Sequence, residues 1–202
     1  MYEIIFSWLK ANFVELLGTL SGLLYIFFSI RQNVWLWPIG LISSAFYIPV
    51  FFGKTLYADM LLQVYYLVVS IYGWYFWING KKKNDKEPGK IKITTLKKLN
   101  WAITIFATLV LTLALFYPLK KYTNASNPFT DSFCFAGSIV ATWMLARKIL
   151  EQWLIWIVVD AISIGLFVYK QLYITVVLYF VFTVLAIIGY LQWKKNFKAQ
   201  LV

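Results

Sequence analysis

The most constraining feature of this 202-residue chain is a succession of seven long apolar stretches. Each is close to the roughly 20 residues that an α-helix needs to cross the hydrocarbon core of a bilayer. Hydrophobic residues make up 61% of the chain and charged residues only 13%, and the mean hydropathy is +0.71. These values predict an all-α integral membrane protein with seven transmembrane helices and no soluble domain. The stretches lie at 12–30, 34–52, 57–78, 100–118, 129–147, 151–169 and 172–193.

Several classes of functional site are poorly supported by the composition. Histidine is absent and Cys134 is the only cysteine, so the common metal sites, a Cys–His nucleophile pair and an internal disulfide are not expected. We therefore expect no enzyme, no metal and no cofactor. The formal net charge is +11, but the basic residues fall between and after the apolar stretches rather than on a folded basic face. A nucleic-acid partner is therefore not expected either.

The basic residues predict the orientation of the chain in the membrane. When successive loops are assigned to alternate sides, fourteen of the 19 basic residues fall on one side. The positive-inside rule then places the N-terminus outside and the C-terminus in the cytoplasm. The fourteen are Arg31, the eight lysines between 81 and 98, Arg147, Lys148, Lys194, Lys195 and Lys198.

An internal repeat emerges when the chain is compared with itself at a shift of 116 residues. Apolar matches are common in such a sequence, but matched Trp, Gly, basic and acidic positions in one ungapped register are not. The matched pairs include Glu15 with Asp131, Arg31 with Arg147, Trp37 with Trp153, Lys54 with Lys170, Gly73 with Gly189 and Trp77 with Trp193.

This repeat predicts a three-plus-one-plus-three arrangement. Because each copy has an odd number of spans, a single linker span between them makes both copies run in the same direction. The alternative is a duplicated scaffold without a solute pathway. The predicted parts are a first three-helix repeat at 1–78, a basic cytoplasmic linker at 79–99, a linker transmembrane helix at 100–118 and a second three-helix repeat at 129–202.

A carboxylate interrupts the apolar stretch EQWLIWIVVDAISIGLFVYK, residues 151–170. Asp160 lies roughly 15 Å from either end of this segment if it is helical. A charge at the bilayer centre costs ~2.5–3.5 kcal/mol on insertion scales, and no basic residue lies at comparable depth in the seven stretches. Three interpretations follow: Asp160 binds a cationic or hydrogen-bond-donating ligand, it carries a coupled proton, or it is a neutral acid bonded to its helix neighbours.

Other polar and aromatic residues at membrane depth are candidates for the same site. Trp156 and Ser163 share a helix face with Asp160, at i−4 and i+3. Aromatic faces with amide and hydroxyl groups suit a flat heteroaromatic ring that carries positive charge. The further candidate substrate-binding residues are Trp37, Ser44, Tyr47, Gln63, Tyr66, Tyr179 and Thr183. Four other tryptophans are predicted to be anchors at the membrane interface, namely Trp35, Trp74, Trp77 and Trp193.

These motifs resemble the PnuC family of bacterial vitamin transporters, best known for nicotinamide riboside. The resemblance is carried by W-P-x-G, Y-x-D and Y-G-W within 35–77 and by W-x-x-W-x-x-x-[ND] within 130–193. It implies a SWEET-like architecture of seven helices and a homotrimer in the bacterial inner membrane. It also implies facilitated diffusion of a small-molecule vitamin, which a cytoplasmic vitamin kinase then traps by phosphorylation.

By position, the conserved tryptophan and polar residue of that family correspond to Trp156 and Asp160. Nicotinamide riboside carriers usually have Asn at the second position, so Asp160 is a departure. Thiamine is an alternative substrate, because its aminopyrimidine could donate to a carboxylate. A proton-coupled carrier, whose uptake would collapse with a protonophore, and a membrane enzyme or structural protein, which would show no solute flux, also stay open.

Overall fold

The computed structural model describes residues 13–53, 57–80, 91–122 and 127–201. Within these ranges the chain forms seven α-helices, and its only β-type pairing is an isolated parallel bridge between Thr94 and Ile149. The helices are α2 (Phe13–Ile30), α3 (Leu36–Gly53), α4 (Tyr57–Asn79), α5 (Lys98–Tyr122), α6 (Pro128–Ala146), α7 (Gln152–Tyr169) and α8 (Tyr173–Ala199).

Six of these helices, α3 to α8, are long and apolar enough to cross a membrane. The seventh, α2, contributes a shorter apolar segment over Leu17–Ile30. The all-α membrane architecture is therefore confirmed. The predicted ends agree with the observed ones within a few residues, although α8 continues six residues beyond the predicted end at 193.

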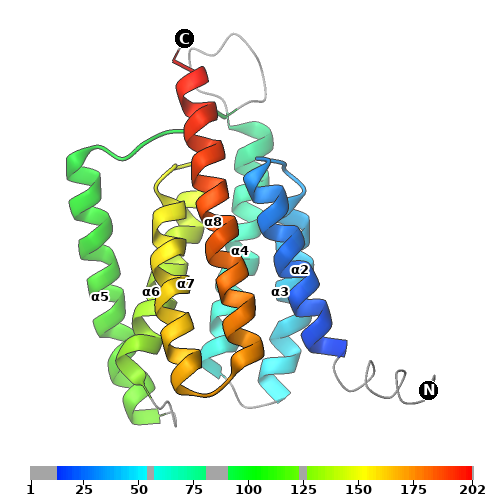
Figure 1. The fold of residues 1–202 in the computed structure, drawn as a ribbon, viewed down its shortest axis with the longest axis vertical. Coiled ribbons are helices and arrows are strands. Elements are labelled where there is room, and N and C mark those ends of the chain that lie inside the picture. Colours follow the sequence, from blue (N-terminus) through cyan, green and yellow to red (C-terminus); the bar gives the residue numbers. More distant parts are fainter. Residues whose placement is uncertain (1–12, 54–56, 81–90, 123–126, 202) are drawn as a thin grey trace.

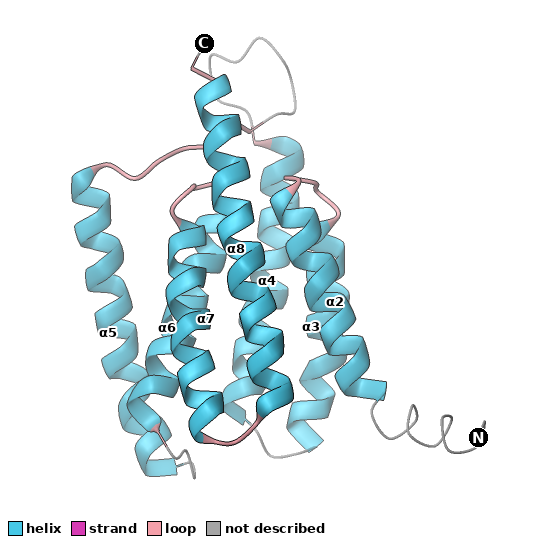
Figure 2. Cartoon of the chain, in the orientation of Figure 1, coloured by secondary structure: helices cyan, strands magenta, loops and turns pink. Residues whose placement is uncertain are grey.

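The helices form an up-and-down bundle (Figures 1 and 2). We call the end at which α8 finishes the C-terminal end of the bundle, and the end at which α2 begins the N-terminal end. Helices α2, α4, α6 and α8 run toward the C-terminal end, and α3, α5 and α7 run back. The first helix set, α2–α4, and the second helix set, α6–α8, therefore run in the same direction, and α5 packs against α6.

The two helix sets contact each other crosswise. Helix α2 packs against α8, and α4 packs against α6. The first helix of each set thus meets the third helix of the other, as a two-fold relation about an axis along the bundle would require.

A core rich in tryptophan fills the C-terminal end. Trp37 and Trp77 meet edge to face, with centroids 5.5 Å apart and planes at 86°. Trp153 and Trp193 repeat this contact at 5.7 Å and 84°. The positions of the two pairs differ by 116 residues, so the same packing is built twice.

Glycines permit the close approach of two of these rings. The space that a Cβ on Gly73 would need is occupied by the Trp37 ring, and the Trp153 ring occupies the same space at Gly189. Only glycine leaves room for an indole directly against the helix backbone. The matched glycines are therefore explained by packing against the matched tryptophans.

The prediction that Trp77 and Trp193 anchor the protein at the interface is wrong. Their exposed fractions are 5% and 0%. Trp77 Nε1 donates to the carbonyl of Ala146 at 3.1 Å, and Trp193 Nε1 donates to the carbonyl of Ser29 at 3.0 Å. Carbonyls in the last turn of a helix lack intrahelical partners, so they are natural acceptors for a buried indole.

The turns that follow α2 and α6 are also alike. Gln32 and Lys148, which are 116 residues apart, both have φ of 53°. The next residue in each turn donates its N–H to a carbonyl five residues back, Asn33 to Phe28 and Ile149 to Met144, both at 2.9 Å. The backbone correspondence between the helix sets therefore extends into the loops.

The basic linker predicted at 79–99 is packed against the bundle in the part that the structure describes. Thr94 exchanges backbone hydrogen bonds with Lys148 and Leu150 at 3.0 and 2.9 Å, and Ile93 is 3% exposed. Leu96 N donates to the Glu151 carboxylate at 3.1 Å. Residues 91–96, which we call the strap, thus lie across the α6–α7 turn, whereas 81–90 fall outside the described residues.

Candidate functional site

Asp160 lies in the middle of α7, and its side chain is 5% exposed. Among the described residues, nothing forms a hydrogen bond or an ion pair with its carboxyl group. Ser163, one turn further along the same face, is also 5% exposed. A buried carboxyl group without a basic partner is costly unless a ligand or a proton neutralises it.

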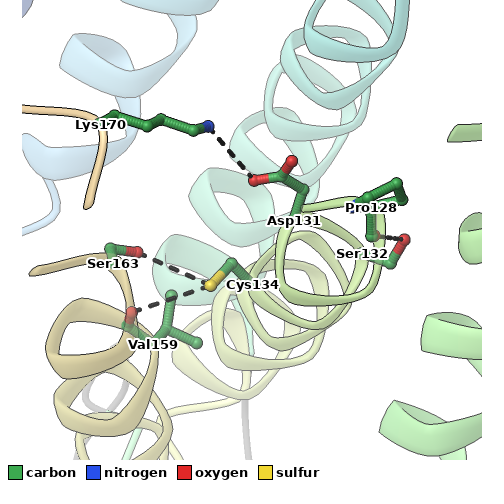
Figure 3. A network of polar contacts seen from close by, with 7 residues as sticks. All are labelled: Pro128, Asp131, Ser132, Cys134, Val159, Ser163 and Lys170. Atoms are coloured by element: carbon green, nitrogen blue, oxygen red, sulfur yellow. Dashed lines mark hydrogen bonds and ion pairs between the residues drawn. The ribbon is translucent and has the colours of Figure 1, made fainter. Parts of the chain in front are cut away.

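Helix α6 brings small polar groups to this face of α7 (Figure 3). The Ser163 hydroxyl donates to Cys134 Sγ at 3.7 Å, and Cys134 Sγ lies 4.0 Å from the carbonyl oxygen of Val159. The Cys134 thiol is also close enough to the Asp160 carboxyl group for the two to interact electrostatically. The sulfur therefore lies beside the backbone and side chains that flank the carboxylate.

Two tyrosines from other helices complete the cluster. Tyr66 of α4 lies close to Ser138 and to Asp160. Tyr179 of α8 also lies close to Asp160, and its ring lies 4.9 Å from the ring of Phe167 at 46°. We call Asp160, Ser163, Tyr66, Tyr179, Cys134 and Ser138 the Asp160 cluster. It combines one carboxyl group with two phenols and small hydroxyl and thiol groups from four helices.

Further acids lie between this cluster and the N-terminal end. Asp59 and Asp131 occupy the first turns of α4 and α6, and they are electrostatic neighbours. Lys170 Nζ lies 3.9 Å from the Asp131 carboxylate (Figure 3). Acids in a first helical turn complement the helix dipole, and here they add negative charge at the N-terminal end of the bundle.

The opposite end carries a buried cation. Lys148, in the α6–α7 turn, is 8% exposed, and burial lowers the pKa of its ammonium group from 10.5 to about 8. Its Nζ lies 4.3 Å from the centroid of the Trp77 ring and 3.2 Å from the carbonyl oxygen of Ile91. These two contacts favour the charged form and so oppose the effect of burial.

The candidate residues of the first helix set have packing contacts within that set. Trp37 is 0% exposed in the tryptophan core, and Ser44 is 3% exposed. The Tyr47 hydroxyl reaches Gly18, and its ring stacks on Phe51 with centroids 5.6 Å apart. The contacts named here for Trp37 and Tyr47 lie within α2, α3 and α4.

Three further candidates lie around the cluster without a described contact to Asp160. Trp156 is partly buried and packs against the tryptophan core. Thr183 donates its hydroxyl to the carbonyl of Tyr179 at 2.9 Å, within its own helix. Gln63 is partly buried on α4, one turn before Tyr66. The structure therefore brings together Asp160, Ser163, Tyr66 and Tyr179, and it leaves the roles of the other candidates as predictions.

Sequence reasoning missed Cys134 and Ser138. Both belong to a polar stripe on α6 with a four-residue period, in which Ser138 donates to the Cys134 carbonyl at 2.8 Å and Thr142 to the Ser138 carbonyl at 2.7 Å. This spacing within an apolar helix is the signal that could have identified them. No group of three potential metal ligands of the His, Cys, Asp or Glu type occurs within the described ranges.

Comparisons with known proteins identify the family. A family model described as nicotinamide mononucleotide transporter matches residues 12–195. The nicotinamide riboside transporter PnuC of Escherichia coli is 28% identical over 206 residues, covering 90% of this chain and 85% of that protein. The riboflavin/roseoflavin transporter RibM of Streptomyces davaonensis is 29% identical over 153 residues, covering 75% of this chain and 70% of that protein.

The fold is similar to a solved structure. A crystal structure of the vitamin B3 transporter PnuC superposes with a TM-score of 0.75 at 23% identity, covering 98% of this chain and 87% of that one. The family match over most of the chain, the two relatives and the shared fold give one conclusion. The chain belongs to the PnuC family of membrane transporters.

Proposed function

We propose that the protein imports nicotinamide riboside across the bacterial inner membrane by facilitated diffusion. The observation that carries the proposal is the Asp160 cluster, in which a buried carboxyl group has no basic partner among the described residues. The pyridinium ring of nicotinamide riboside supplies a positive charge for the carboxylate and a flat face for the rings of Tyr66 and Tyr179. Transport of this vitamin by the Escherichia coli relative supports the same substrate.

The proposed orientation places the C-terminal end of the bundle in the cytoplasm and the N-terminus outside. The clustering of basic residues at the C-terminal end supports it, since Arg31, Arg147, Lys148 and the lysines after Trp193 all lie there. Asp59 and Asp131 then face the outside, where they attract a cationic solute.

We further propose that the two helix sets are copies of one unit in a SWEET-like, three-plus-one-plus-three repeat, and that the protein is a homotrimer. The repeated tryptophan pairs, turns and crosswise contacts support the repeat. Helix α5 then joins the copies, and its large exposed apolar surface is available for lipid and for neighbouring subunits.

Facilitated diffusion alone only equalises the concentrations on the two sides, so accumulation requires a cytoplasmic step that keeps the vitamin inside. We propose that a vitamin kinase phosphorylates it, because the added charge prevents its return. A membrane potential also favours entry of a cation, by about 2.3 kcal/mol per 100 mV for each charge. The proposed mechanism therefore needs no coupled ion.

Thiamine is the second candidate substrate, and the carboxylate of Asp160 favours it. Thiamine also has a cationic ring, and its aminopyrimidine carries a donor for a carboxylate oxygen. The similarity to a riboflavin transporter supports the view that substrates differ within this family. A proton-coupled carrier that uses Asp160 as its titrating group is a further alternative.

Uptake into liposomes tests these proposals. The purified protein should move labelled nicotinamide riboside in a saturable way until the inside and outside concentrations are equal, and a kinase with ATP sealed inside should extend the uptake. A protonophore should leave the rate unchanged. Flux of thiamine alone would select the second candidate, collapse with the protonophore would select the proton-coupled carrier, and flux of neither vitamin would refute a vitamin transporter of this kind.

A further inference from the structure

Gln152, the first residue of α7, is a buried polar residue that the Asp160 cluster does not include. Its side chain is 0% exposed. Neither its amide nitrogen nor its amide oxygen has a hydrogen-bond partner among the described residues. Buried amides are almost always paired, and an unpaired one lowers stability. A group that is retained at such a cost calls for an explanation other than packing.

Gln152 lies on the same helix face as the candidate site. Gln152, Trp156 and Asp160 follow each other at i+4 spacing, so they line one side of α7. Gln152 lies roughly 12 Å along the helix from Asp160, on the side of the C-terminal end. Both ends of this line are polar, and both are less than one-tenth exposed.

The first helix set shows that the scaffold does not need an amide at this position. The residue of α3 that corresponds to Gln152 is Leu36, which is also 0% exposed. An apolar side chain therefore fills the equivalent place in the tryptophan core. Of the two middle helices, only α7, which also carries Asp160, has an amide side chain at this position.

Two hydrogen bonds join the helix sets at the C-terminal end, where α7 begins. The indole of Trp77, in the first helix set, donates to Ala146 in the second. The indole of Trp193, in the second set, donates to Ser29 in the first. Separation of the two helix sets at this end would break both bonds and uncover the start of α7.

We propose that Gln152 is a second solute-binding residue, located between Asp160 and the cytoplasm, that pairs with the hydroxyl groups of the vitamin when the C-terminal end opens. An amide offers both a donor and an acceptor, and a hydroxyl group also does both, so the two form matched hydrogen bonds. This inference rests on the proposed function, because it requires a hydroxyl-bearing vitamin to pass along α7. The amide is then unpaired while the C-terminal end is closed, and it binds the solute only while this end is open.

The test replaces Gln152 with the residue that the first helix set has at the same position. Gln152→Leu should raise Tm by roughly 2–4 °C, because it removes an unpaired amide from the core. Affinity for nicotinamide riboside, measured by titration of the purified protein, should stay within about twofold, while the initial rate of liposome uptake should fall at least about tenfold. The matched control, Leu36→Gln, should lower Tm and leave the uptake rate per folded molecule within about twofold.

Gln152→Met, with similar length and no amide, should reproduce the loss of rate. The inference is overturned if either variant folds and transports at the wild-type rate, because Gln152 is then a packing residue. It is also overturned if neither variant folds, because the amide is then structural. A wild-type protein that moves neither nicotinamide riboside nor thiamine would refute the proposed function and this inference with it, whereas unchanged variants of an active protein refute the inference alone.

Discussion

The two helix sets share their packing but differ in their chemistry. In both, a tryptophan at the start of the middle helix packs on a glycine and meets a second tryptophan edge to face. At the centre of the same helices, however, Ser44 of α3 corresponds to Asp160 of α7. The tryptophan packing is thus present twice and the carboxylate once, so the carboxyl group of the Asp160 cluster has no counterpart in the first helix set.

The contacts around the two middle helices differ in the same way. In the first set, the large Tyr47 reaches Gly18. The corresponding contact in the second set joins two small polar residues, Ser163 and Cys134. The second helix set therefore has two small polar side chains where the first has a bulky ring against a glycine.

A third pair of contacts lies between the helix sets. Tyr66 of α4 lies close to Ser138 of α6. At the corresponding residues, Phe182 of α8 and Gly22 of α2, a ring faces a glycine. The phenol and hydroxyl therefore have no counterpart at this contact, although Ser21 of α2 and Ser43 of α3 pair elsewhere in the other half, at 3.1 Å.

The largest losses of stability are expected from substitutions in the tryptophan packing that both helix sets share. Trp37→Ala and Trp153→Ala each remove a fully buried indole from the core, and each should lower the free energy of unfolding by about 3–5 kcal/mol. Thermal unfolding in detergent measures both. A large loss from one substitution and almost none from the other would show that the two cores are not equivalent.

The next largest effect, on substrate binding, should differ between the two helix sets. Asp160→Ala should weaken binding of nicotinamide riboside and of thiamine by about 1.5–3 kcal/mol, because it removes a charged acceptor. Ser44→Ala at the equivalent position should change binding by less than about 0.5 kcal/mol. Isothermal titration of the purified variants gives both values. Equal losses would mean that Ser44 contributes as much to binding as Asp160.

The indole bonds at the C-terminal end provide a smaller test. Trp77→Phe and Trp193→Phe keep a ring but remove the indole donors to the carbonyls of Ala146 and Ser29, and the Ser29 carbonyl still accepts from the Gln32 N–H at 3.0 Å. The cost should be about 1–3 kcal/mol of stability for Trp77→Phe and less for Trp193→Phe. Thermal unfolding of both variants and of the double variant measures this. If neither variant loses stability, these bonds do not hold the two helix sets together.

The smallest effect concerns Lys148, whose counterpart in the first helix set is Gln32. The pKa of Lys148 is lowered to about 8 in the folded protein, whereas the unfolded chain keeps this proton up to about pH 10.4. The unfolded state binds more protons between these values, so stability should rise with pH from about 8 to 10 and be flat below. Lys148→Gln should remove this rise, which is on the order of 1 kcal/mol for each pH unit within this interval. A parallel rise in both proteins would assign it to other groups.

Much of the fold was predictable because its signals are local or repeated. The lengths of the apolar stretches predicted the membrane-spanning helices. Comparison of the chain with itself at a shift of 116 residues paired Trp37 with Trp153 and Gly73 with Gly189. Depth in an apolar stretch identified Asp160, since no periodic or capping role explains a carboxylate there.

What could not be predicted depends on tertiary partners. Hydropathy cannot distinguish a tryptophan at the lipid interface from one in a core, so Trp77 and Trp193 were assigned wrongly. The packing of Ile93 in the strap depends on a turn more than 50 residues further along the chain. Cys134 and Ser138 are small residues that fit any apolar helix, and only their neighbours on α7 and α4 reveal their place in the cluster.

The central claim is that residue 160 selects the vitamin, and Asp160→Asn tests it most directly. The substitution is nearly isosteric, keeps a carbonyl acceptor, removes the charge and adds a donor. Affinities for nicotinamide riboside and thiamine should be measured side by side on wild type and variant. We predict that thiamine affinity falls at least about tenfold, because a buried donor loses its carboxylate acceptor. Nicotinamide riboside affinity should stay within about threefold or rise, because the added amide donor can pair with the carboxamide oxygen of this vitamin and offset the lost charge pairing. Equal changes for the two vitamins, or no change for either, would contradict the claim.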